Sequence, residues 1–329
     1  MPELPEVETV VRDLRRLIPG ATIIDASTHW ARTVRGMAPD AFAAAVAGRR
    51  IEGVSRRGKQ IVVELSGESF LTIHLKMTGQ LFVVRQGGLP DPYVRLVLEL
   101  DDGREVWFRD IRKFGRIGLY VAADDPFAAI GPEPLADTFT LALFRKRLRT
   151  RKGRLKPLLI DQSFVAGIGN IYADEALWAA RLHPLRSARS LRPADERRLY
   201  LEVRRILAEA VERRGSSIDD YTAPEGDGSM QERLLVYQRA GEPCRRCGRP
   251  IRRIVVGGRA THFCSWCQRL PAADRAGAAA ILRTMSTPSR RGRRWTELGG
   301  EESAGLTRAE RTQKAAATRR AAARLAAGR

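Results

Sequence analysis

Cysteines, acidic residues and long apolar stretches are all scarce in this sequence, and each shortage narrows the class of protein. Four cysteines occur in 329 residues, and all lie between positions 244 and 267. No apolar stretch approaches the roughly 20 residues of a membrane-spanning helix. The first residues also lack the charged, apolar and small-residue regions of a secretory signal. We therefore expect a soluble intracellular protein with no membrane partner.

The shortage of acidic residues leaves the chain strongly basic. There are 38 Asp and Glu against 58 Lys and Arg, which gives a formal net charge of +20. Such a balance indicates a polyanionic partner and says nothing about the fold. With a membrane partner disfavoured, nucleic acid is the leading candidate. The length is sufficient for two domains and a further small element.

The cysteines themselves predict that small element. They form two Cys-x2-Cys pairs sixteen residues apart, Cys244 with Cys247 and Cys264 with Cys267. This spacing is typical of a structural zinc site, because each pair places two sulfurs on one tight turn. Four thiolates complete the tetrahedron and leave no position for water, so one structural zinc is expected rather than a catalytic metal. Disulfides are the alternative, which clustering in a chain with no secretory signal disfavours.

Hydrophobic periodicity divides the remaining chain into two bodies and a tail. Residues 7–18 carry a helical apolar face. Eight short β-branched or aromatic runs follow between turns, at 21–26, 51–55, 60–65, 69–75, 80–84, 94–100, 105–108 and 116–121. They predict a two-sheet β-sandwich or a flattened barrel. From about residue 139 the pattern becomes helical, most clearly at 195–213, and residues 251–256 and 260–263 suggest a hairpin within the cysteine cluster.

The last segment, residues 271–329, has a different composition. It is rich in alanine and holds 13 basic and 5 acidic residues without a sustained apolar stripe. Such a segment cannot bury enough apolar surface to order itself, so a basic, disordered tail is expected. An inert tail and a non-specific DNA tether are both open, and we favour the tether.

The first residues offer a candidate nucleophile. Removal of Met1 would leave Pro2 as a free secondary amine. A terminal amine titrates near ~8 and a lysine near ~10.4, so a useful fraction of this amine is unprotonated at neutral pH. It can then attack an electrophilic carbon to form a Schiff base, with Glu3 placed to move protons. The alternative is that Pro2 and Glu3 merely begin a helix.

A second candidate site lies in the helical body. Residues 155–161 and 170–180 read as two helices joined by a turn that contains Gly167 and Gly169. These glycines allow close backbone approach, and the free N–H groups at the start of the second helix form an anion site to which Asn170 can add an amide. A plain pair of core helices is the alternative.

Taken in order along the chain, the motifs resemble bacterial formamidopyrimidine-DNA glycosylase, within the formamidopyrimidine-DNA glycosylase and endonuclease VIII family. The resemblance covers roughly the first 270 residues. The matching motifs are Pro2 to Thr9, Arg57-Gly58-Lys59, His74 to Gly79, Asp110 to Gly115, Gly131 to Leu135, Gly167 to Glu175 and the zinc ribbon. The resemblance implies an α+β multidomain fold. Its parts would be an N-terminal β-sandwich with an N-terminal helix (1–125, catalytic), a helix-two-turn-helix DNA-binding domain (135–237), a C-terminal four-cysteine zinc ribbon (238–270) and the tail (271–329).

The same resemblance implies base-excision DNA repair by a bifunctional enzyme. Such an enzyme flips oxidised purines, namely 8-oxoguanine and formamidopyrimidines, out of the duplex and excises them. It also acts as an AP lyase, nicking the strand by β,δ-elimination. The expected partner is double-stranded DNA that contains oxidised bases or abasic sites. We expect a monomer in the bacterial cytoplasm, associated with the nucleoid.

Catalytic roles also follow from the resemblance. Pro2 would attack C1′ of the damaged nucleoside and form the Schiff base, with Glu3 as the acid/base. Lys59 resembles the lysine of β-elimination, for which a solvated strand-end lysine is the alternative. Arg259, in the zinc hairpin, resembles the arginine tied to δ-elimination.

Further residues resemble DNA contacts. Met77, Arg112 and Phe114 match the trio that fills the gap left by the flipped base, although core packing is the ordinary role of Met and Phe. Three others match phosphate contacts: Arg151, Lys156 and Asn170. The polar segment 216–230 lies where the family has the loop that caps the flipped base, and a surface linker is its alternative.

Departures from the family pattern leave some assignments open. Tyr93 stands where a histidine that touches DNA is common, so Tyr93 is a candidate DNA contact in doubt. An endonuclease VIII-like enzyme for oxidised pyrimidines is one alternative, but its start resembles Pro-Glu-Gly-Pro and it lacks the trio, so Leu4 and the trio favour purines. A non-catalytic zinc-ribbon DNA-binding protein is the other, and it would not need Pro2, Glu3 and Lys59 together.

Overall fold

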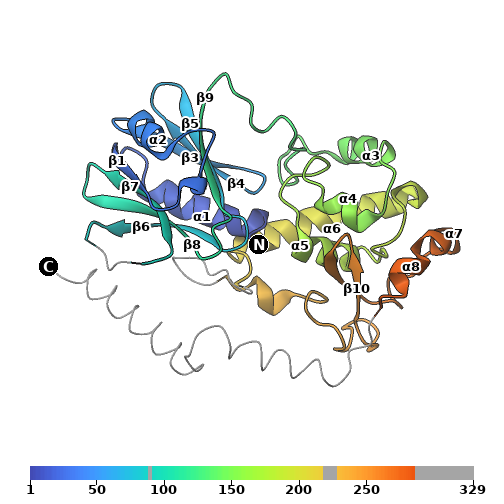
Figure 1. Ribbon diagram of the computed structural model, residues 1–329. Helices are drawn as coiled ribbons and strands as arrows, with labels where there is room; N and C mark the ends of the chain where they lie inside the picture. Colours follow the sequence, from blue (N-terminus) through green and yellow to red (C-terminus); the bar gives the residue numbers. More distant parts are fainter. Residues whose placement is uncertain (88–90, 218–227, 286–329) are drawn as a thin grey trace, which may run out of the picture. The chain divides into compact units, whose positions relative to one another are not determined.

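A buried helix, α1 (Leu4–Leu17), begins the fold (Figure 1). The structure is a computed structural model that describes residues 1–87, 91–217 and 228–285. The backbone N–H of Glu3 donates to the Glu6 carboxylate at 2.8 Å, and Pro5 occupies the first turn, where a missing N–H leaves no bond unmade. The predicted apolar face is buried, and it contacts strands β3, β4 and β6 of the two sheets described next.

Two sheets enclose α1. One has the strand order β1 (Ile23–Thr28), β7 (Val94–Leu100), β8 (Arg104–Asp110) and β6 (Gly79–Arg85). The other has the order β2 (Val34–Arg35), β9 (Arg116–Val121), β5 (Ser69–His74), β4 (Gln60–Leu65) and β3 (Ile51–Arg57). Only the short β2–β9 pair is parallel among the described strands. The prediction of an N-terminal β-sandwich with a helix is confirmed.

Two short elements of this sandwich were absent from the sequence-based prediction. Helix α2 (Pro39–Val46) buries Phe42 and Val46, a single pair four residues apart that is too short a pattern to predict a helix. Strand β2 spans two residues and follows a short 3-10 helix, η1 (Ala31–Thr33). Such elements form because neighbouring strands provide partners, and local periodicity does not reveal them.

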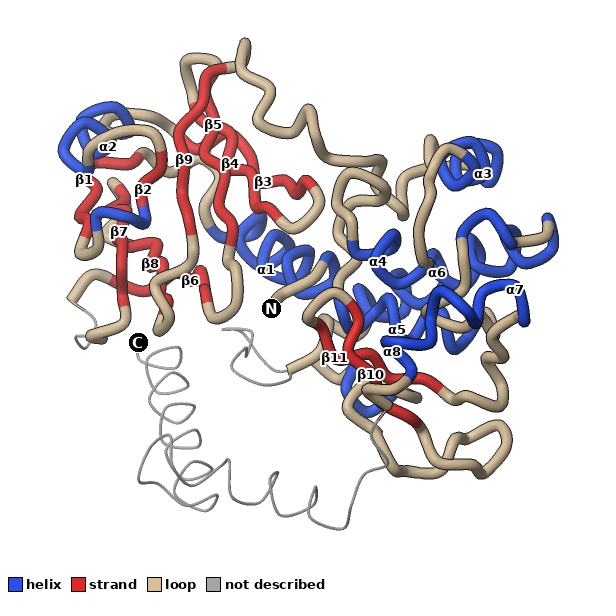
Figure 2. The backbone as a smooth tube through the Cα atoms, turned by 45° about the vertical axis from the view of Figure 1, so that its right-hand side comes forward, coloured by secondary structure: helices blue, strands red, loops and turns tan. Residues whose placement is uncertain are grey.

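A mainly helical region follows β9. Its helices are α3 (Leu141–Arg149), α4 (Leu155–Ile160), α5 (Asn170–Ala179) and α6 (Pro193–Glu212), with the 3-10 helices η2 (Ala188–Ser190) and η3 (Met230–Arg233). Every residue of α5 after Asn170 is buried, so this helix lies in the centre of its core. Figure 2 shows α5 among the other helices and close to the last hairpin.

The predicted zinc ribbon is a hairpin of β10 (Arg252–Val256) and β11 (Arg259–Phe263). Gly257 and Gly258 join the strands, with φ of 57° and 73°. A two-residue turn with two positive φ values matches the right-handed twist of the strands and favours glycine at both positions. The four-cysteine element of the predicted fold class is therefore present.

Residues 271–285 correct the prediction of a disordered tail that begins at residue 271. They form α7 (Ala272–Arg275), the 3-10 helix η4 (Ala276–Ala278) and α8 (Ala279–Leu282). Ala278, Ile281 and Leu282 pack beside Leu270 against the apolar side of the hairpin. Their spacing of three and four residues is helical, a local signal that the composition of the whole tail concealed. Residues 286–329, with the proposed DNA tether, lie outside the described part of the chain.

Residues 218–227 also lie outside it, so the predicted base-capping loop is not described over most of its length. Among the helices that the structure does describe, none combines the length and apolarity needed to cross a bilayer.

We expect a chain that ends at Leu270 to have a less stable zinc hairpin than one that ends at Met285. The longer chain retains the apolar contacts of Ala278, Ile281 and Leu282, and their loss should cost the hairpin about 1–3 kcal/mol. Amide hydrogen exchange of β10 and β11 measures the difference. Equal protection in the two chains would show that these contacts contribute nothing.

Candidate active site

The carboxylate of Glu3 lies at the N-terminus of α5. It accepts hydrogen bonds from the backbone N–H groups of Gly169 at 2.7 Å, Ile171 at 2.8 Å and Tyr172 at 3.3 Å. These N–H groups have no partner inside the helix, and the helix dipole favours a negative charge there. The predicted anion site therefore exists, but an internal carboxylate fills it. It is not free for a phosphate.

The glycine turn before α5 permits this approach. Gly167 has φ +82°, and a Cβ there would lie 2.6 Å from the Leu4 side chain. A Cβ on Gly169 would lie 2.5 Å from a Glu3 carboxylate oxygen and 2.7 Å from Lys59 Nζ. The predicted acid/base and the predicted β-elimination lysine therefore converge on Gly169. No other residue type leaves room for both side chains.

Lys59 is buried, with 6% of its surface exposed. Burial lowers the pKa of its ammonium, Arg259 lowers it further, and the carboxylates of Glu3 and Glu6 oppose the shift. A lysine with a lowered pKa has a larger neutral fraction at a given pH, and is a better proton acceptor near neutrality. This burial contradicts the alternative of a solvated strand-end lysine.

Glu6 was not predicted as a site residue, yet it lies beside Glu3. Its buried carboxylate accepts hydrogen bonds from the Tyr172 hydroxyl at 2.6 Å and the Ser216 N–H at 2.8 Å. Burial raises the pKa of Glu6, and the nearby Glu3 charge raises it further. The sequence signal was its position three residues after Glu3, which is that of a capping-box acid.

A cavity of about 140 Å³ lies at the start of α1 and α5. Its lining includes five predicted residues, Pro2, Glu3, Met77, Asn170 and Arg259, and Ser216, which begins the predicted base-capping segment. Four further lining residues were not predicted as site residues: Met1, Glu6, Ile171 and Tyr237. Pro2 is buried, and the buried side-chain oxygen of Asn170 accepts no hydrogen bond in the described structure. The cavity therefore brings together residues from six separate parts of the sequence.

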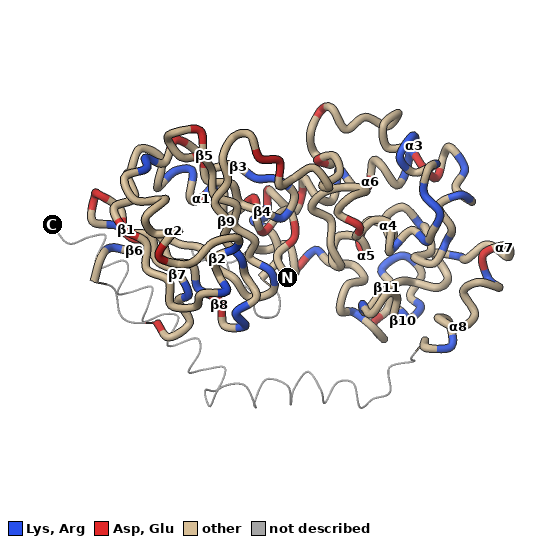
Figure 3. Tube along the Cα trace, turned by 45° about the horizontal axis from the view of Figure 1, so that its top comes forward, with Lys and Arg blue, Asp and Glu red and all other residues tan. Residues whose placement is uncertain are grey.

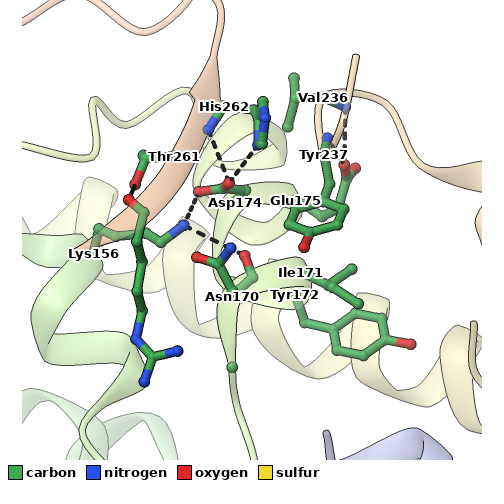
Figure 4. A network of polar contacts seen from close by, with 12 residues as sticks. Lys156, Asn170, Ile171, Tyr172, Asp174, Glu175, Val236, Tyr237, Thr261 and His262 are labelled. Atoms are coloured by element: carbon green, nitrogen blue, oxygen red, sulfur yellow. Dashed lines mark hydrogen bonds and ion pairs between the residues drawn. The ribbon is translucent and has the colours of Figure 1, made fainter. Parts of the chain in front are cut away.

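Lys156 has a structural position rather than the predicted phosphate-binding one. Its side chain is fully buried, its ammonium pairs with Asp174, and it lies 3.4 Å from the Asn170 carbonyl oxygen (Figure 4). An ammonium that is wholly buried and already paired with a carboxylate cannot contact a DNA phosphate, so the prediction for Lys156 is wrong. The second Asp174 oxygen accepts the His262 N–H at 2.9 Å and so fixes β11.

The next residue, Glu175, holds a loop of the cavity. Its carboxylate accepts the N–H groups of Leu235 at 2.9 Å, Val236 at 2.9 Å and Tyr237 at 2.8 Å, as Figure 4 shows in part. The Tyr237 ring lies edge-on to His262, with centroids 5.3 Å apart. Burial raises the pKa of Glu175. Two neighbouring acids on α5 thus fix two parts of the cavity wall: Asp174 holds the hairpin that carries Arg259, and Glu175 holds the loop that carries Tyr237.

The predicted gap-filling trio is on the surface. Met77 is 37% exposed and Phe114 is 47% exposed, and the Arg112 guanidinium lies 5.0 Å from the Phe114 ring centroid. The fully buried Asp110 shapes this turn, because its carboxylate accepts the N–H groups of Arg112 at 3.2 Å and Gly115 at 2.7 Å. Exposure of two large apolar side chains contradicts the alternative of core packing.

Three predicted DNA contacts stay predictions. Tyr93 is 40% exposed, and the Arg109 guanidinium lies 5.0 Å from the centroid of the Tyr93 ring. Arg151 donates to the Ser163 hydroxyl at 3.2 Å. Asn170 lines the cavity. Figure 3 shows basic residues beside β8 and along β10 and β11, as a phosphate-binding protein requires.

The four cysteine sulfurs lie within 4.8 Å of one another. Zn–S bonds of about 2.3 Å at tetrahedral angles separate sulfurs by about 3.8 Å, so this donor set fits one zinc ion. Cys244 to Cys247 form one turn of the zinc site, which we call the zinc knuckle. In it, the Arg246 guanidinium lies 3.6 Å from the Trp178 ring centroid and donates to the Ala179 carbonyl at 3.1 Å. The zinc knuckle is therefore joined to the C-terminal end of α5.

Comparison with known proteins covers the same regions. Sequence models match for the formamidopyrimidine-DNA glycosylase N-terminal domain (residues 1–117), its H2TH domain (130–222) and the zinc finger found in FPG and IleRS (241–270). The formamidopyrimidine-DNA glycosylases of Herpetosiphon aurantiacus and Chloroflexus aurantiacus are 46% and 47% identical over 274 residues. These alignments cover 82% of this chain and 100% and 98% of theirs.

Solved structures are similar as well. The Lactococcus lactis enzyme in complex with N7-benzyl-Fapy-dG DNA has a TM-score of 0.77 and 37% identity, and the MutM protein of Thermus thermophilus has 0.74 and 44%. Each comparison covers 82% of this chain and all of the other.

Gly169→Ala should disable the site without unfolding the protein. The new Cβ would displace the Glu3 carboxylate and the Lys59 ammonium, and a displacement of about 1 Å costs about 100-fold in rate. Cleavage of a duplex with one 8-oxoguanine measures the effect. Gly53→Ala is the matched control, because its Cβ would meet only the side chain of Glu64. Full activity of the Gly169 variant would contradict the convergence described above.

Proposed function

This chain belongs to the formamidopyrimidine-DNA glycosylase family, and we propose that it excises oxidised purines from DNA. The cavity at the start of α1 and α5 is the proposed site of this reaction. The chain is a base-excision repair enzyme with DNA glycosylase and AP lyase activities and one structural zinc. Relatives from Lactococcus lactis form complexes with Fapy-dG DNA and with abasic DNA. We assign both substrates, together with 8-oxoguanine, to this chain.

Pro2 is the proposed nucleophile. After Met1 is removed, its nitrogen lone pair bonds to C1′ of the flipped nucleotide, and the electrons of the C1′–N9 bond leave with the base. Opening of the sugar ring then moves a proton to O4′ and leaves an iminium between Pro2 and C1′, with Glu3 as the acid/base. The burial of both residues on one cavity and the three N–H groups that hold the Glu3 carboxylate support these roles.

Strand cleavage is assigned to two basic residues. In β-elimination a base removes a C2′ proton and the C3′–O bond breaks, and we assign the proton transfer to Lys59. In δ-elimination a C4′ proton is removed, the C5′–O bond breaks and the phosphate leaves, and we assign this step to Arg259. The burial of Lys59 beside Glu3 and the place of Arg259 on the cavity wall support the two assignments.

The surface trio supports purine specificity and base flipping. Met77 and Phe114 would occupy the gap in the base stack, and Arg112 would contact the base left opposite, which offsets an unstacking cost of a few kcal/mol. An endonuclease VIII-like activity on oxidised pyrimidines is the alternative substrate range, and Leu4 and the trio favour purines over it. Damaged chromosomal DNA as substrate would place the enzyme at the bacterial nucleoid.

The Schiff base gives a direct test of Pro2. Pro2→Gly, or a retained extension ahead of Pro2, should abolish borohydride trapping on an abasic duplex and abolish nicking. Duplex affinity should stay within about tenfold, because phosphate contacts elsewhere supply most of it. Full strand cleavage by an N-terminally extended protein would refute the proposed nucleophile.

The lowered pKa of Lys59 predicts a pH dependence. The rate of β-elimination on an abasic duplex should rise with pH through an apparent pKa below the 10.5 of an ordinary lysine. Below this pKa the ammonium holds its proton and cannot accept one from C2′, so the rate falls as the pH falls. Single-turnover rates between pH 6 and 10 measure the profile. The same rise in Lys59→Ala would assign it to another group.

A further inference from the structure

Lys59 occupies a two-residue turn whose conformation is strictly limited. Strands β3 and β4 pair through Arg57 and Gln60, so only Gly58 and Lys59 join them. Gly58 has φ +58°, in the left-handed region that other residues adopt only with strain. A Cβ on Gly58 would make only ordinary van der Waals contacts with Ile130 and Ala166, so the limit comes from the backbone conformation and not from space. The direction of the Lys59 side chain therefore depends on what holds this turn.

One carboxylate holds it from outside the two strands. Glu133 follows β9 by twelve residues, in the segment that leads to α3. One of its oxygens accepts the Gly58 N–H at 2.6 Å and the Arg57 guanidinium at 3.0 Å. The other pairs with the Arg56 guanidinium at 2.7 Å. Three donors from three consecutive residues thus converge on a single side chain.

The neighbouring contacts strengthen the same connection. Arg57 donates a second hydrogen bond to the Ile130 carbonyl at 2.8 Å, and Arg56 donates to the Gly58 carbonyl at 2.8 Å. Both guanidiniums are thereby directed at the turn, and both need a counter-charge there, because they are only 10% and 27% exposed. Glu133 provides that charge to both, and Glu8 is a second partner of Arg56 alone. Hydrogen bonds to a charged partner contribute more to stability than bonds between neutral groups.

We propose that Glu133 is a positioning residue for β-elimination, acting through the turn that presents Lys59. This inference rests on the proposed role of Lys59. Glu133 touches neither the cavity nor the ammonium. The charges that act on the Lys59 pKa are those of Glu3, Arg259 and Glu6. Glu133 therefore sets where the amine lies and leaves its proton affinity to the other three.

Glu133→Gln is the informative change. One carboxylate oxygen accepts two hydrogen bonds and the other forms an ion pair with Arg56. An amide must turn its NH₂ group toward either Arg56 or the Gly58 N–H, and that contact becomes a repulsion between donors. We expect the β-elimination rate on an abasic duplex to fall at least about tenfold. The pH profile should keep its midpoint and lose height, and trapping of the Pro2 adduct by borohydride should stay within about twofold.

Three comparisons make the result decisive. Glu8→Gln removes the other carboxylate on Arg56, which lies 2.9 Å away, without touching the turn, so it should leave all rates unchanged. Glu133→Asp, which retains the charge, should recover part of the loss. Lys59→Ala tests the premise, because β-elimination that survives it would refute the role of Lys59 itself.

The inference is overturned if Lys59→Ala loses β-elimination while Glu133→Gln retains it. It is also overturned if Glu133→Gln lowers trapping and elimination equally, because general damage to the fold acts on both. A shifted midpoint of the pH profile would overturn it as well, since the effect would then be on the pKa of the amine. Thermal unfolding of each variant accompanies the rate measurements.

Discussion

The active site depends on one contact, between the Glu3 carboxylate and the N-terminus of α5. Glu3 directly follows Pro2, whereas α5 begins 167 residues later. Burying a carboxylate is costly unless it is hydrogen-bonded, and three backbone N–H groups meet that requirement here. The same contact satisfies donors that α5 would otherwise leave unpaired. The position of the first residues is thus fixed by a bond that the helix itself needs.

Helix α5 extends this control to other parts of the cavity. Asp174 binds the backbone of β11, which begins at Arg259, and Glu175 binds the backbone that carries Tyr237. At the other end, Arg246 from the zinc knuckle donates to a carbonyl of the last turn. One ten-residue helix therefore sets the positions of Glu3, the proposed acid/base, of the hairpin and of the Tyr237 loop. The four-cysteine site is therefore connected through α5 to a cavity whose proposed chemistry does not use the metal.

Much of the fold and part of the site could be predicted from the sequence. Apolar periodicity predicted the sandwich, α6 and the hairpin, and cysteine spacing predicted the zinc site. The prediction for Lys156 failed because its partner, Asp174, is eighteen residues away and pattern does not show that pairing. Tyr237 was missed for the same reason, because its backbone is held by Glu175, 62 residues away. Glu6 and Asp110 do show local signals, in the capping box and in the turn before Gly115, but these signals indicate structure and not a site. The short helices of residues 271–285 were missed because their apolar pattern spans few residues, and the prediction used the composition of the whole segment 271–329.

The charges inside the protein differ from those on its surface. The net charge is +20, yet the cavity is surrounded by the buried carboxylates of Glu3 and Glu6. These carboxylates stabilise the charged form of Lys59, whereas burial and the charge of Arg259 destabilise it. The pKa of Lys59 is lowered, so burial and Arg259 together outweigh the two carboxylates. Arg259 stands on the zinc hairpin, and the hairpin is held by Asp174. Any change that moves the hairpin therefore moves a positive charge relative to Lys59. Through Arg259, the position of the hairpin therefore affects the charge around Lys59 as well as the lining of the cavity.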